Sequence, residues 1–157
     1  MTSTARSLAA VLCITLMTAC SSPGSDTAFK APAGWSSTPG LFGRFQMWIS
    51  GNAQNNRQIL MLIRADQNTN IEESNNFGGT RNVNNVHHRQ IMICGDQHAD
   101  YFTGRGESSS GSNHAPVLLE GIVTSVHNAR YVAVYIRPAA LPPDTQAETA
   151  IRSICPQ

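Results

Sequence analysis

The clearest strand pattern in the chain extends from Arg130 to Arg137, near its end. It is rich in β-branched and aromatic residues and contains no Gly or Pro, which predicts a strand. Residues on both faces of this strand are apolar, so we expect an inner strand that is covered on both sides. Pro138 lacks a backbone N–H donor and is expected to end it.

A second pattern, at helical spacing, follows this strand. Ala147, Ala150, Ile151 and Ile154 fall on one stripe of a helix. Either Thr145 with Glu148, as a capping box, or Asp144 could cap its first turn. We expect the stripe to pack on a sheet, with Cys155 at the end of the helix.

Five other segments show strand patterns, and two further segments link them. Strands are predicted over 44–50 and 58–63 as a hairpin, over 86–94 and 98–103 around a turn, and over 117–126. The Asn-rich segment 65–85 allows a short helix at 71–77, and the Gly/Ser-rich segment 104–113 predicts an exposed loop. The expected class is α+β: a mostly antiparallel sheet of five or six strands with a C-terminal helix packed on it.

Composition limits the function classes. The 157 residues carry a formal net charge of +1 and are 41% hydrophobic. This fits a single domain with a core, and it gives no basic surface of the kind that binds nucleic acid.

The N-terminus has the pattern of an export signal. Arg6 precedes an apolar run at 8–17 that is shorter than the roughly 20 residues of a membrane span. The sequence Leu16-Met17-Thr18-Ala19-Cys20 resembles the lipobox of bacterial lipoproteins, although Met17 stands where Leu is usual. The resemblance implies a lipoprotein signal peptide at 1–19, lipidation of Cys20, a flexible tether at 20–28 and one domain at 29–157. The alternative is an ordinary secretory signal cut near Ala19.

Two cysteines, Cys94 and Cys155, remain after Cys13 in the signal and Cys20. An exported chain meets oxidising conditions, so we expect them to form a disulfide. The alternatives for Cys94 are a metal ligand or a nucleophile with His98 as its base. The chain has no Cys-x-x-Cys motif.

Five histidines raise the hypothesis of a metal site. His87 and His88 are adjacent in a predicted strand and therefore face opposite ways. The candidate metal ligands are His88, His98 and Asp96, with Asp100 as a substitute, but their spacing matches no zinc motif. The segment 104–111 lacks the Lys of a phosphate-binding loop and has no nucleophile elbow.

The architecture also resembles a known superfamily. The residues that carry the resemblance are Phe29, Pro32, Gly34 and Trp35, followed by antiparallel strands and the stripe Ala147, Ala150, Ile151 and Ile154. This pattern is similar to the PsbP/Mog1-like superfamily, which includes small bacterial lipoproteins of the DcrB and LpqN type. The resemblance implies accessory or binding roles without shared catalytic residues, so it transfers no site.

We therefore expect an exported protein, lipid-anchored to the cell membrane or outer membrane, that binds a protein or small-molecule partner and needs no cofactor. The aromatic residues Trp35, Trp48, Tyr101 and Phe102 could line a ligand groove or belong to the core, and Arg105 could contact a partner. The alternative function is a metal-assisted envelope hydrolase that uses His88, His98 and Asp96.

Overall fold

A large antiparallel sheet dominates the computed structural model, which describes residues 27–39, 44–52, 55–68, 79–108 and 114–157. Its seven strands lie in the order β2-β3-β4-β8-β7-β6-β5, and a second sheet pairs β1 with β9. The elements are β1 Thr27–Ala28, β2 Ser36–Pro39, β3 Phe45–Ser50, β4 Gln58–Asp66, β5 Thr80–Ile93, β6 Gln97–Ser108, β7 Pro116–Val126, β8 Ala129–Pro138, α1 Thr145–Arg152 and β9 Cys155–Pro156.

The expected α+β class is wrong, because the described residues form nine strands and one eight-residue helix. The main sheet has seven strands instead of five or six. The helix is not the last element of the chain, because β9 follows it and pairs with β1 near the start of the domain. The protein is therefore mostly β.

Much of the difference between the expected and the observed strand content comes from two segments that were not predicted to be strands. Gly104 to Ser108, predicted as a loop, continues β6. Gly106 allows a close approach of the two strands, because a Cβ at this position would lie 3.1 Å from the carbonyl oxygen of Arg81. The neighbouring strand β5 begins at Thr80, inside the Asn-rich segment 65–85, for which no strand was predicted.

The predicted inner strand and hairpin are confirmed. β8 lies between β4 and β7, and every residue from Tyr131 to Ile136 is buried. β3 and β4 pair antiparallel from Phe45 opposite Ile63 to Ser50 opposite Gln58. The β7–β8 link, His127-Asn128, has positive φ at both residues, as a two-residue hairpin turn requires.

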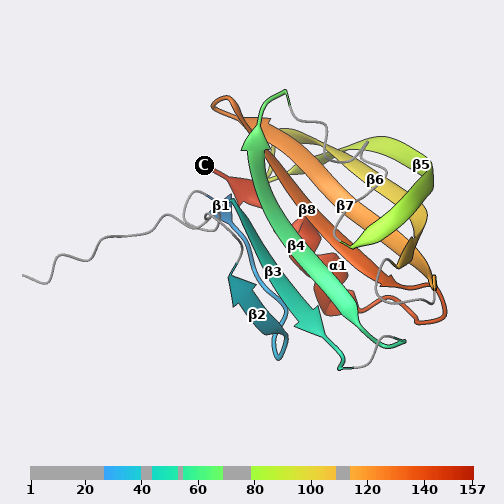
Figure 1. The fold of residues 1–157 in the computed structure, drawn as a ribbon. Helices are drawn as coiled ribbons and strands as arrows, with labels where there is room; N and C mark the ends of the chain where they lie inside the picture. Colours follow the sequence, from blue (N-terminus) through green and yellow to red (C-terminus); the bar gives the residue numbers. More distant parts are fainter. Residues whose placement is uncertain (1–26, 40–43, 53–54, 69–78, 109–113) are drawn as a thin grey trace, which may run out of the picture.

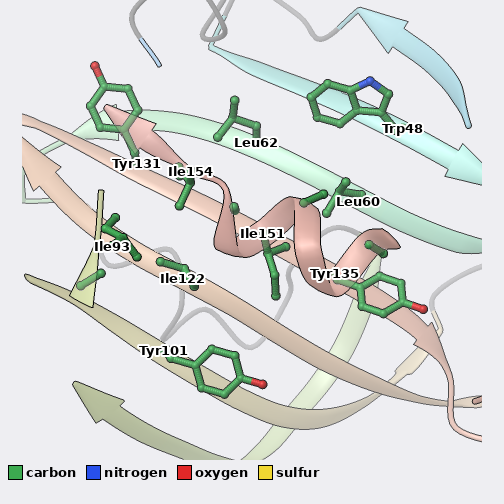
Figure 2. Packing of buried hydrophobic residues seen from close by; sticks show 14 of the residues in the cluster. Trp48, Leu60, Leu62, Ile93, Tyr101, Ile122, Tyr131, Tyr135, Ile151 and Ile154 are labelled. Carbon is green, nitrogen blue, oxygen red and sulfur yellow. The ribbon is translucent and has the colours of Figure 1, made fainter. Parts of the chain in front are cut away.

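Both faces of the sheet are apolar, which is why β4 and β8 lack simple alternation. On one face, here called the helix face, Leu60, Leu62 and Ile122 pack with Ile151 and Ile154 from the α1 end of the chain (Figure 2). Figure 1 shows α1 behind the sheet at the level of β4 and β8. The other face holds a separate cluster that includes Phe102, Val132 and Val134. Full burial of each such side chain stabilises the folded state by about 1.5–3 kcal/mol relative to leaving it exposed.

The helix begins at the expected place. The side chain of Asp144 accepts hydrogen bonds from the backbone N–H of Gln146 at 2.8 Å and of Ala147 at 3.3 Å. Asp144 is thus the N-cap, and the two possible caps are resolved in its favour. Ala147, Ala150 and Ile151 are buried against the sheet.

Several expectations lie outside the described residues: the signal peptide, Cys20, most of the tether and the short helix at 71–77. Within the described ranges, no helix combines the length and apolar character that crossing a membrane would need.

Candidate functional site

A disulfide joins Cys94 and Cys155, the two cysteines that were predicted to pair. Cys94 lies in the β5–β6 turn and Cys155 in β9, and their Cα atoms are 5.6 Å apart, within the range of disulfides. The bond closes a chain separation of 61 residues. Cys94 is therefore neither the partner of a His98 base nor a free metal ligand.

The structure does not bring His88, His98 and Asp96 together. His88 lies opposite Phe102, and His98 is four residues from Phe102 along β6. At about 3.3 Å per residue, the two histidine positions are about 13 Å apart. His88 pairs instead with Asp100, with Nδ1 and Oδ2 2.6 Å apart. In the part of the chain that the structure describes, no three His, Cys, Asp or Glu residues form a group that could hold a metal.

The four candidate aromatic residues are divided between the two faces. Trp48 and Tyr101 belong to the cluster on the helix face, and Trp35 packs against this cluster with its ring centroid 6.2 Å from that of Tyr135. Phe102 belongs to the cluster on the opposite face. They are core residues of two layers, so the single aromatic groove is not formed.

A groove of about 310 Å³ lies on the helix face, between α1 and strands β5, β6, β7 and β8. This volume is at the lower end of the range for small-molecule sites, which begins near 300 Å³. The side chains that carry its chemistry are His87, Thr103, Arg105, Leu118, Glu120, Tyr135, Arg137 and Glu148. We define these residues as the helix-side groove.

Strand register arranges the floor of the groove in two rows. Glu120 on β7 lies between Thr103 on β6 and Tyr135 on β8. Leu118 lies between Arg105 and Arg137 in the next row. Because neighbouring strands are about 4.8 Å apart, the backbones of the two arginines are about 10 Å apart. Acidic and basic groups therefore occupy adjacent rows of one surface.

Tyr101 positions Glu120 from within the core. The Tyr101 hydroxyl donates to Glu120 Oε2 at 2.7 Å. The guanidinium carbons of Arg89 and Arg152 lie 4.5 Å and 5.2 Å from the centre of the Tyr101 ring. Burial, and then the hydrogen bond to Glu120, raise the pKa of Tyr101 to about 12, so the phenol remains a donor at neutral pH.

Tyr135 holds the groove floor to the start of α1. Its side chain is fully buried, and its hydroxyl accepts from the backbone N–H of Asp144 at 3.0 Å and donates to Gln58 Oε1. Burial raises its pKa to about 12. Figure 2 shows the hydroxyls of Tyr101 and Tyr135 pointing toward the same end of the sheet.

The charge of Arg137 opposes the rise in the pKa of Glu120 that burial causes, but among the described residues the carboxylates of the groove form no direct ion pair with its arginines. Considering only described residues, no ion pair at 4.0 Å or less joins Glu120 or Glu148 to Arg105 or Arg137. Arg137 donates to the carbonyl oxygen of Leu141, which orients its guanidinium. Burial raises the pKa of Glu120, and the nearby Glu148 carboxylate raises it further, against the opposing effects of Tyr101 and two arginines. The groove thus presents both signs of charge to whatever enters it.

The sequence patterns did not identify Glu120 as a site residue. One signal was present: Glu120 is the only charged residue between Val117 and Val126, in a strand that is otherwise mostly apolar. A charged side chain in such a strand indicates a functional or structural polar site. Glu148 was considered only as part of a capping box.

Glu120→Gln is expected to raise the melting temperature at pH 8 and to change it less at pH 4. The folded-state pKa of Glu120 is raised, so the stability from this group is complete below the ordinary glutamate pKa and is lost as pH rises through the folded value. Gln removes the charge and keeps an oxygen for the Tyr101 hydroxyl. Calorimetry at the two pH values measures the difference, and Glu107→Gln controls for the loss of one negative charge. A lower melting temperature for Glu120→Gln at pH 8 would contradict this expectation.

Comparison with known proteins supports the fold alone. No family model matches the chain, and no curated protein matches it. A crystal structure from Bacteroides thetaiotaomicron VPI-5482 is similar, with a TM-score of 0.55 at 12% sequence identity. The match covers 87% of this chain and 47% of that one, so this chain spans about half the length of that protein. The likeness concerns the arrangement of the strands.

Proposed function

We propose that the protein is an exported, lipid-anchored binding module of the cell envelope that takes a small polar ligand in the helix-side groove. The observation that carries the proposal is the groove itself, in which two carboxylates and two guanidinium groups, all on described residues, share about 310 Å³ without an ion pair between them. Groups of this kind fix the orientation of a bound small molecule.

Export and anchoring rest on the sequence around Cys20, which resembles a lipobox, with the apolar run before it. The Cys94–Cys155 disulfide fits a compartment in which thiols are oxidised. The similarity to PsbP/Mog1-like lipoproteins is part of the same proposal. A binding role is favoured over catalysis because the hydroxyls of Tyr101 and Tyr135 are engaged in hydrogen bonds that hold the groove in place.

Mass spectrometry of the protein purified from membranes tests both parts of the proposal. We expect a mature chain that begins at Cys20 and carries an acyl mass, with a small molecule released on denaturation. The double variant Arg105→Ala/Glu148→Ala should keep the acyl mass and lose the small molecule. The matched control is Arg57→Ala/Asp66→Ala, which removes one charge of each sign from exposed positions on and beside β4.

Two results would overturn the proposal. A chain without an acyl group would remove the lipid anchor. If the wild type releases no small molecule, or if both double variants release it in equal amounts, the groove is not its binding site.

A further inference from the structure

The acidic part of the helix-side groove is built from two separate elements. Glu120 comes from β7 in the sheet, and Glu148 comes from α1, which covers the sheet. The two carboxylates are close enough for Glu148 to act on the charge of Glu120. Two carboxylates in a partly buried space repel each other, and Arg137 and Arg152 offset this only in part, because the pKa of Glu120 remains raised. The position between helix and sheet therefore favours a positively charged group.

The basic part lies in the next row of the same floor. Arg105 on β6 and Arg137 on β8 flank Leu118, with His87 near the β5 side. Guanidinium groups bind carboxylates through two parallel hydrogen bonds. This row therefore favours a carboxylate.

The distance between the two rows limits the length of the ligand. Leu118 and Glu120 are two residues apart on β7 and face the same side, so the backbone positions of their rows are about 7 Å apart. Two extended amino-acid residues span at most about 7 Å. The spacing of the rows thus matches the separation between the amino and carboxyl ends of a dipeptide.

Ligands with only one kind of charge fit less well. A phosphate or a dicarboxylate would meet Glu120 and Glu148, and a polyamine would meet Arg105 and Arg137. The ring of Tyr135 is fully buried, so it provides no exposed face on which a sugar could stack. A ligand that carries both charges can meet the acidic and the basic part of the groove at once.

We infer that the groove binds a small zwitterion the size of a dipeptide, with its free ammonium group between Glu120 and Glu148 and its free carboxylate at Arg105. This inference rests on the proposed function, because it specifies the ligand of the same groove. It requires no covalent step.

Isothermal titration calorimetry of the full mature protein with alanyl-alanine tests the inference. Acetylation of the ammonium group or amidation of the carboxylate should each weaken binding by about tenfold or more, because each removes a charge-assisted hydrogen bond. These changes are made in the ligand, so they do not depend on whether a variant folds. Glu120→Gln should lower the affinity for the free dipeptide and remove the penalty of acetylation, whereas Arg105→Gln should remove the penalty of amidation. Arg57→Gln, outside the groove, should change neither.

Failure of this inference can be distinguished from failure of the proposed function. Equal affinity for the free, acetylated and amidated dipeptides would overturn the inference that the ligand is a zwitterion. Absence of dipeptide binding, together with a different molecule released from the wild type but not from the groove variant, would overturn the inference and leave the binding module in place. If neither the dipeptide nor any released molecule depends on the groove, both fail.

Discussion

Removal of the Cys94–Cys155 disulfide is expected to lower the free energy of unfolding by about 4 kcal/mol. The bond joins residues 61 positions apart, so its loss gives the unfolded chain many more conformations. In the folded protein it links the β5–β6 turn to β9, the last strand, which pairs with β1. Urea denaturation of Cys94→Ser/Cys155→Ser under oxidising conditions measures the change.

Reductant provides the matched control for this prediction. Dithiothreitol should destabilise the wild type to about the level of the double variant and should leave the double variant unchanged. The result that would contradict the expectation is a double variant as stable as the oxidised wild type.

The elements that were predicted correctly are those in which local pattern and tertiary environment agree. β8 is buried on both sides, and its continuous apolar sequence indicated this. α1 carries its apolar stripe and its cap within a single short segment, so no distant residue was needed to recognise it. The two cysteines were paired because composition and compartment left no other partner.

The elements that were missed depend on irregular or very short pairing. In β5, positive φ at Asn82 and Asn85 accompanies register shifts near Arg81 and Asn84, which break the two-residue period. In β6, the glycines indicated a loop, but Gly106 lies in the strand and packs closely against the backbone of β5. β1 and β9 have two residues each, too few to produce a pattern. Because these strands were missed, the expected class was α+β, whereas the structure is mostly β.

The candidate site was hidden for a related reason. Glu120 and Glu148 are 28 positions apart and meet only because α1 returns across β7 and β8. His88 and His98 are closer in the sequence, but the register of the hairpin separates them along the strands. Residues distant in the sequence thus share the groove, whereas residues close in the sequence lie apart. The register of the sheet, and not sequence separation, determines which polar groups converge.

The groove and the core share one helix, because α1 carries Glu148 toward the groove and Ile151 into the sheet. Ile151→Ala is expected to lower the free energy of unfolding by about 2–5 kcal/mol, since Ile151 is fully buried and its truncation leaves a cavity. It should also weaken ligand binding, because Glu148 lies less than one turn before Ile151. Urea denaturation measures the first effect, and titration with alanyl-alanine measures the second.

Thr149→Ala is the control on the same helix. Thr149 is exposed, and its hydroxyl donates to the backbone oxygen of Thr145 at 2.7 Å. Ala is the better helix former, so this variant should change stability by no more than about 0.5 kcal/mol and should retain binding. If Ile151→Ala costs as little as Thr149→Ala, α1 does not pack on the sheet through Ile151. A large loss of stability with unchanged binding would instead show that the groove does not depend on the position of Glu148.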